Sequence, residues 1–232
     1  MKTFSLFLCA AMCSVLVSAQ ISPTGSWQYK DGSTTHVLLF HDSYFTHSIF
    51  DVGGKQFIRS FGGPFRINAA TMTVDVEFDT QSKDSVGRSF TYPFSMSGEV
   101  MNFNAGTGVM AWQRVDRGNV NLAGNWRITG RMEGGTLQQM QRGDRKTLKL
   151  LTADRFQWFA INPKTKEFFG TGGGTYTFKD GKYTETIEFF SRDNSRVGAS
   201  LSFDGKLEGN NWYHSGKSSK GDPISEVWTR EK

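Results

Sequence analysis

The sequence predicts an all-β protein built from two tandem antiparallel barrels. Three observations support this prediction: a hairpin that can be identified residue by residue, a repeat that covers most of the 232 residues, and strand-like segments with no long helical period between them. Many short strands separated by turn residues are typical of barrels and sandwiches.

The hairpin lies within residues 171–191, TGGGTYTFKDGKYTETIEFFS. Aromatic and β-branched residues, which fit a pleated surface, stand on both sides of a short turn. At the turn, Asp180-Gly181 supplies the two positive-φ positions that a tight hairpin needs. We therefore expect an antiparallel pair of strands at 167–179 and 182–191.

The repeat divides the chain into two units. Gly25-Ser26-Trp27 recurs as Gly124-Asn125-Trp126, and Gly62 corresponds to Gly173 at an offset of 111 residues that then holds as far as Gly98 and Gly209. A period this long indicates duplicated domains rather than a solenoid. We expect one barrel over residues 20–116, a second over 117–232, and a short linker at about 116–120.

Each unit should contain about eight antiparallel strands in an up-and-down barrel, which leaves no exposed sheet edge. The second unit also carries an insertion at 132–144, which is polar and contains glycine; it is either a lid over the barrel mouth or a surface loop. The strands expected in the second unit are 125–131, 146–152, 155–162, 167–179, 182–191, 198–207, 211–216 and 224–230.

Residues 1–19 are typical of a cleaved signal peptide. Lys2 is followed by an apolar run, and Val17-Ser18-Ala19 forms a small-residue cleavage site. The run is too short for a spanning helix. Both cysteines lie inside this segment, so the mature chain would have no disulfide or thiol chemistry. We expect an exported protein, periplasmic or secreted, with no membrane span.

Charge is distributed unevenly between the units. The chain carries a formal net charge of +5, with 7 basic against 9 acidic residues at 20–116 and 19 against 13 at 117–232. This balance would suit an acidic ligand or an anionic surface. No basic run interleaved with aromatic residues is present, so we expect no nucleic-acid partner.

Each unit pairs an early Gly-x-Trp with an Arg on the last strand: Trp27 with Arg114, and Trp126 with Arg230. This arrangement resembles the calycin superfamily, the lipocalins and their relatives. The resemblance implies that the Trp closes one end of the barrel while the Arg stacks across its ring. The second unit is further similar to exported bacterial lipocalin-like proteins of uncharacterised activity, through residues 154–158, 172–176 and 183–189. The first unit resembles a degenerate copy, with Val74 at the position of Glu185.

Alternation along the strand after the turn places Tyr183, Glu185, Ile187 and Phe189 on one face. If that face lines the lumen, Glu185 is a carboxylate in an apolar cavity, and it must be paired, neutral or functional. The alternative is a cross-strand ion pair at the rim. The expected ligand-binding residues are Trp158, Tyr176, Tyr183, Glu185, Arg196 and Trp212.

Signals for metal or cofactor chemistry are weak. The four histidines show no spacing typical of a zinc site, Gly172-Gly173-Gly174 is not followed by a helix as a phosphate-binding loop would be, and there is no serine nucleophile motif. We therefore expect no cofactor and no metal.

The leading hypothesis is an exported protein that binds a small apolar or amphipathic molecule, mainly in the second barrel. One alternative is a lyase, isomerase or hydrolase that uses Glu185 as general acid or base with Tyr176 or His214. Another is a module that binds a glycan or a protein. The sequence leaves the oligomeric state open.

Overall fold

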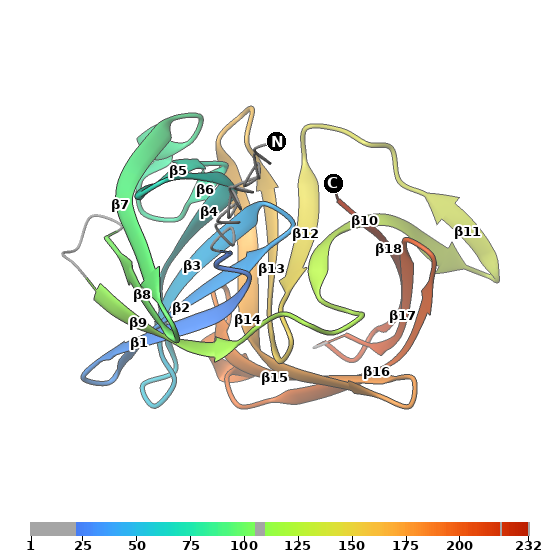
Figure 1. Cartoon of the computed structure of the whole chain (residues 1–232). Helices are drawn as coiled ribbons and strands as arrows, with labels where there is room; N and C mark the ends of the chain where they lie inside the picture. Colours follow the sequence, from blue (N-terminus) through green and yellow to red (C-terminus); the bar gives the residue numbers. More distant parts are fainter. Residues whose placement is uncertain (1–21, 105–109, 219, 232) are drawn as a thin grey trace, which may run out of the picture.

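The computed structural model describes residues 22–104, 110–218 and 220–231, and it contains two closed barrels of antiparallel strands lying side by side (Figure 1). The predicted signal peptide lies outside the described residues. The prediction of an all-β fold with two up-and-down barrels of eight strands each is confirmed.

The first barrel closes through the pairing of β3 with β4, and neighbouring strands follow the order of the chain. The short strand β6 pairs with β4 in addition, and a 3₁₀ turn, η1 (Lys83–Ser85), precedes β7. The strands are β1 (Gly25–Asp31), β2 (Thr34–His41), β3 (Tyr44–Asp51), β4 (Gln56–Asn68), β5 (Thr71–Asp75), β6 (Phe78–Asp79), β7 (Ser89–Ser97), β8 (Val100–Phe103) and β9 (Met110–Asp116).

The second barrel closes through the pairing of β10 with β18, and a 3₁₀ turn, η2 (Asn194–Arg196), matches η1. Its additional strand, β11, comes from the insertion. The strands are β10 (Gly124–Glu133), β11 (Thr136–Gln139), β12 (Lys146–Leu151), β13 (Arg155–Asn162), β14 (Glu167–Lys179), β15 (Lys182–Phe190), β16 (Ser200–Glu208), β17 (Asn211–Lys217) and β18 (Pro223–Arg230).

Glycines allow the long strand β14 to bend where it crosses β15. The register shifts between Gly173 and Gly174, and a Cβ on Gly174 would lie 2.0 Å from the backbone oxygen of Thr186. In the first barrel, a Cβ on Gly63 would lie 1.9 Å from the backbone oxygen of Asp75. Only glycine permits this close approach of two backbones, which explains the recurrence of glycine in both units.

The inside of the first barrel contains a large cluster of buried side chains. Its core has Trp27 at one end and includes two buried histidines, His36 and His47, whose Nδ1 and Nε2 atoms lie 3.2 Å apart. Burial lowers the pKa of both histidines, and the pKa of His47 lies well below its ordinary value. The apolar core residues are Trp27, Leu38, Phe40, Phe45, Phe61, Met72, Val74, Val76, Val86, Phe94, Met101, Phe103 and Trp112.

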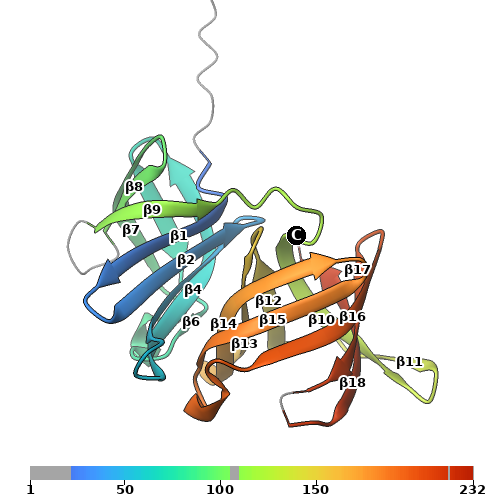
Figure 2. The same cartoon turned by 90° about the horizontal axis from the view of Figure 1, so that it is seen from below.

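The two barrels share a separate apolar cluster on their outer faces, where β2 and β3 lie beside β12 and β13 (Figure 2). The rings of Phe50 and Phe189 stack at 4.8 Å between centroids. At the centre of the interface, the Gln157 amide accepts a hydrogen bond from Ser48 and donates one to Ser60. Burial of this apolar surface fixes the two barrels against each other.

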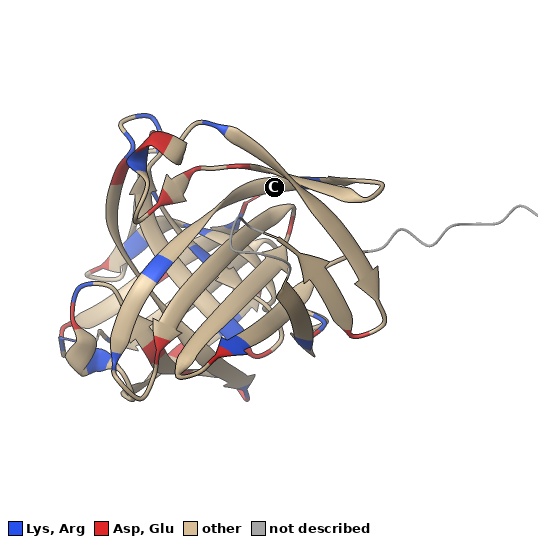
Figure 3. Cartoon of the chain, turned by 90° about the vertical axis from the view of Figure 1, so that its left-hand side faces the viewer, with Lys and Arg blue, Asp and Glu red and all other residues tan. Residues whose placement is uncertain are grey.

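On the side of the molecule shown in Figure 3, charges of both signs lie mostly in turns and near strand ends. Exposed opposite charges on the protein form pairs, as in the Arg66–Asp75 contact of 2.7 Å. This face has the mixed charge of an ordinary solvated surface.

Candidate functional site in the second barrel

The lumen of the second barrel holds a buried ion pair. Tyr183, Glu185 and Ile187 on β15 are all buried, so this face of the strand points inward. Opposite, Lys149 on β12 points into the same space, and its Nζ lies 3.1 Å from Oε2 of Glu185. The two side chains are only 5% and 9% exposed. Each charge therefore depends on the other for compensation.

The expectation that Phe189 shares the face of Glu185 is wrong. The bulge opposite Gly173 and Gly174 leaves Glu188 unpaired, so the alternation shifts by one residue. Phe189 consequently packs in the cluster between the barrels, and Phe190 points toward the lumen beside Trp158, with 5.5 Å between ring centroids.

Aromatic rings surround the ammonium group of Lys149. The negative face of an aromatic ring attracts a cation, so this cage helps the charge to remain in the barrel. The distances from Nζ to the ring centroids are 4.9 Å for Tyr183, 5.3 Å for Phe156, 5.4 Å for Trp212 and 5.7 Å for Trp228.

A second polar group lies beside this pair. Nδ1 of His214 is 3.7 Å from Oε2 of Glu226, and the indole N–H of Trp228 donates to the same oxygen at 3.2 Å. Burial, aided by the charge of Lys149, lowers the pKa of His214, so the imidazole is neutral at neutral pH. Burial raises the pKa of Glu226, but contacts with His214, Lys149 and Trp228 outweigh this effect and lower it.

Several buried polar atoms around the lumen have no hydrogen-bond partner among the described residues. They are Oη of Tyr183, Nε1 of Trp212 and both ring nitrogens of His214. Burial and the Glu185 charge raise the pKa of Tyr183 well above its ordinary value, so its hydroxyl keeps its proton. Unsatisfied buried polar groups are costly and rare.

A pocket of about 290 Å³ opens next to His214 and the Lys149–Glu185 pair. This volume is close to the lower end of the range for small-molecule sites. Its wall is mostly aromatic and aliphatic, with the polar cluster on one side. The residues are Thr147, Lys149, Trp158, Glu185, Ile187, Phe190, Leu201, Phe203, His214, Ser218, Ile224, Glu226 and Trp228.

Strand register identifies the residues of the first barrel that are equivalent to the polar residues in the second lumen. Lys149 lies opposite Trp126 as Leu38 lies opposite Trp27, and Glu185 and Val74 occupy matching places on β15 and β5. Tyr183, His214 and Glu226 correspond in the same way to Met72, Phe103 and Met110. The fold thus forms without these polar groups, and their presence in one barrel is not a requirement of its architecture.

The predicted site residues fall into two groups. Trp158, Glu185 and His214 line the pocket, and Tyr183 and Trp212 pack around Lys149. The other two predicted residues lie apart from the pocket. The hydroxyl of Tyr176 donates to the backbone oxygen of Thr152 at 2.6 Å, and Arg196 in η2 contacts Asp193 at 2.9 Å.

Lys149, Phe190, Glu226 and Trp228 were not identified from the sequence. Lys149 stands between two leucines in the strand KTLKLL, where alternation places it opposite their face. That pattern is a usable signal for a charge inside a barrel. Phe190 could not be identified in this way, because its direction depends on the bulge.

The two Trp/Arg pairs close one end of each barrel. The guanidinium carbon of Arg114 lies 4.0 Å from the ring centroid of Trp27, and that of Arg230 lies 4.3 Å from the centroid of Trp126. Both indole N–H groups donate to backbone oxygens four residues earlier, those of Pro23 and Leu122.

Within the described ranges, no three or more His, Cys, Asp or Glu side chains form a group that could hold a metal ion. A search of the same residues finds no helix with the length and apolar character needed to span a membrane.

Comparison with known proteins adds a family match for the second barrel. Residues 121–232 match the family described as a domain of unknown function, DUF4488. Among solved structures, the chain is similar to an uncharacterised protein from Bacteroides eggerthii, with 15% sequence identity over 47% of this chain and 98% of that chain, and a TM-score of 0.33. No curated protein matches the chain.

Proposed function

We propose that the second barrel binds a small amphipathic molecule in its lumen. The observation that carries this proposal is the pocket of about 290 Å³ lined by His214, whose buried Nε2 has no hydrogen-bond partner among the described residues. A ligand with one polar group would give His214 Nε2 the hydrogen bond that it lacks. Its apolar part would replace water against the aromatic wall.

The pocket supports a specific orientation for such a ligand. Trp158 and Phe190 form an edge-to-face pair at the outer part of the wall, where a flat ring or an alkyl chain would pack. The ion pair of Lys149 and Glu185 offers both a donor and an acceptor deeper in the lumen. A hydroxyl or carbonyl group on the ligand would match this end.

The first barrel would serve as a support in this account. Its outer face packs against Leu148, Leu150 and Phe159 of the second barrel. Leu148 and Leu150 flank Lys149 on β12, and Phe159 lies on the neighbouring strand β13. Rigid packing behind a site holds its side chains in place.

We further propose that both units belong to the calycin superfamily and that the chain works outside the cytoplasm after cleavage near Ala19. The Gly-x-Trp and Arg pairs support the first statement. The segment 1–19 supports the second.

Titration with N-phenyl-1-naphthylamine, an uncharged amphipathic dye, tests the binding proposal. We expect saturable fluorescence enhancement with the mature chain and its loss in Ile187→Trp, which fills the pocket. The matched control is Leu137→Trp, at a position 40% exposed on β11. Equal dye binding by both variants, with both folded, would place binding elsewhere and contradict the proposal.

Acid–base catalysis is a second candidate function, because neutral His214 lies near the carboxylates of Glu226 and Glu185. In this version His214 would take a proton from a bound substrate, and Glu226 would stabilise the imidazolium. Tyr176, bonded to Thr152 near the sealed end, would have no part in it. The test is to incubate a ligand recovered from the protein with the natural chain and with His214→Phe. Catalysis predicts turnover by the natural chain and none by the variant.

A further inference from the structure

The second barrel has an open seam between its first two strands. β10 and β12 pair only from Gly124 to Arg127. In the first barrel, the equivalent strands β1 and β2 pair along the whole of Gly25–Asp31. The difference arises from the insertion, which stands where the first barrel has a tight turn at Gly32. Its strand β11 pairs with the part of β10 that β12 leaves unpaired.

The insertion has a defined course over this seam. β11 pairs with β10 from Gly130 to Glu133, and the backbone N–H of Met140 donates to the oxygen of Thr129 at 2.8 Å. Farther on, Arg127 donates to the backbone oxygen of Gly143, also at 2.8 Å. The segment is thus anchored at both ends of the seam rather than lying free.

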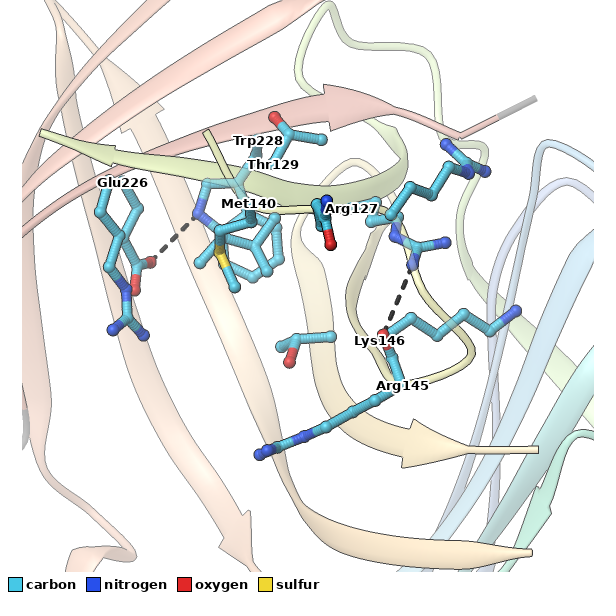
Figure 4. Close-up of a pocket in the computed structure, with 12 residues that line it drawn as sticks. Arg127, Thr129, Met140, Arg145, Lys146, Glu226 and Trp228 are labelled. Carbon is cyan, nitrogen blue, oxygen red and sulfur yellow. Dashed lines mark hydrogen bonds between the residues drawn. The ribbon is translucent and has the colours of Figure 1, made fainter. Parts of the chain in front are cut away.

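A second pocket, of about 440 Å³, lies in the seam, and Figure 4 shows it with Arg127, Arg145 and Lys146 on one side and Glu226 and Trp228 on another. It shares Thr147, Glu226 and Trp228 with the lumen pocket. The same three residues therefore border both spaces. Five basic side chains line the seam: Arg127, Arg131, Arg142, Arg145 and Lys146.

Acidic residues neutralise only some of these cations. Arg127 and Arg142 both contact Glu231, and Lys146 contacts Glu77 of the first barrel at 2.7 Å. Arg131 and Arg145 have no carboxylate partner among the described residues, and Arg145 instead lies over the ring of Phe169 at 4.3 Å. Two guanidinium groups are thus available for an anion.

We infer that this seam is a side entrance to the lumen and that Arg131 and Arg145 hold the negatively charged group of an amphipathic ligand. The inference rests on the proposed function and adds the class of ligand: a carboxylate, sulfonate or phosphate on an apolar body. Guanidinium groups bind such oxyanions with paired hydrogen bonds. In the lumen pocket the one lysine, Lys149, is already paired with Glu185, so the headgroup remains at the seam while the apolar body enters.

A matched pair of dyes tests this inference. 1-Anilinonaphthalene-8-sulfonate has the rings of N-phenyl-1-naphthylamine plus one sulfonate. We expect the mature chain to bind the sulfonate dye more tightly, and Arg131→Gln/Arg145→Gln to lose about tenfold in affinity for it, the loss expected for two charge-assisted contacts. Affinity for the uncharged dye should stay within about twofold, since the variant leaves the apolar wall intact.

The charge control is Lys83→Gln/Lys179→Gln, which removes two exposed cations away from the seam and should leave both affinities unchanged. Sodium sulfate, compared with sodium chloride at equal ionic strength, distinguishes a site for any oxyanion from one that requires the apolar body. Strong competition by sulfate would identify a free inorganic anion as the occupant and contradict the inference of an amphipathic ligand.

The two failures are distinguishable. The inference is wrong, and the proposed function stands, if the uncharged dye binds in the lumen but the sulfonate dye binds no more tightly. The same holds if the arginine variant loses affinity for both dyes equally. If neither dye responds to Ile187→Trp, the proposed function fails and the inference fails with it.

Discussion

Lys149 and Glu185 form an ion pair inside the second barrel at the two positions that Leu38 and Val74 occupy inside the first. The duplicated fold thus offers an internal comparison, since one copy has apolar side chains at these two positions and the other has a buried ion pair. Burial of charge is costly even when paired. Its presence in one copy alone supports a role in binding rather than in folding.

The ion pair itself gives the first prediction. Glu185→Val should lower the free energy of unfolding by about 3 kcal/mol, because it leaves Lys149 buried without its partner. Lys149→Leu/Glu185→Val, which copies the first barrel, should be as stable as the natural chain or more stable. Urea denaturation measures both. A double variant clearly less stable than the natural chain would show that the pair stabilises the fold.

The contact between the barrels gives the second prediction. Phe189→Ala should cost about 3 kcal/mol of unfolding free energy, because it removes a buried ring that stacks on Phe50. Phe50→Ala/Phe189→Ala should cost less than the sum of the single changes, since the rings share one contact. Leu137→Ala, on exposed β11, is the control and should change stability little. Strict additivity of the two phenylalanine variants would contradict a shared cluster.

The sealed end of the second barrel gives the third prediction. Arg230 lies over Trp126 and donates to the backbone oxygens of Ala123 and Asn121. Arg230→Ala should therefore cost about 2 kcal/mol in urea denaturation, from the lost ring contact and hydrogen bonds. Arg66→Ala, which removes an exposed ion pair, should cost less than about 1 kcal/mol. Equal costs would mean that the Trp/Arg pair has no special structural role.

A pair of carboxyl groups at the junction of the barrels gives a pH prediction. Burial raises the pKa of Asp154 to about 6, and neighbouring Asp116 adds to the shift through a hydrogen bond and its charge. Because the folded chain holds this proton more tightly than the unfolded chain, stability should fall as pH rises from about 4 to about 6 and stay lower above that.

The carboxyl group of Asp154 is partly enclosed but the residue as a whole is exposed, so water screens the effect and we expect about 1 kcal/mol. Asp154→Asn should remove this part of the pH dependence, because its amide can donate to Asp116 at any pH. Thermal denaturation between pH 4 and 7 provides the measurement. An unchanged pH slope in the asparagine variant would assign the effect to other groups.

Parts of this structure could be predicted because the signals are local. Asp180 and Gly181 form the expected turn, with φ angles of 51° and 72°, and the recurrence of Gly-x-Trp gave two barrels. The site was predictable only in part. Lys149 meets Glu185 across the lumen, 36 residues away, and the direction of Phe190 depends on a bulge between two other strands. Contacts across a closed barrel leave no local pattern in the sequence.

Native mass spectrometry of the mature chain, purified from the organism that makes it, tests the central claim most directly. We predict a discrete extra mass that is lost on denaturation and absent from Ile187→Trp, and that belongs to an amphipathic molecule. A bare mass in the natural chain, together with no uptake of either dye into the lumen, would contradict a ligand-binding role for the second barrel.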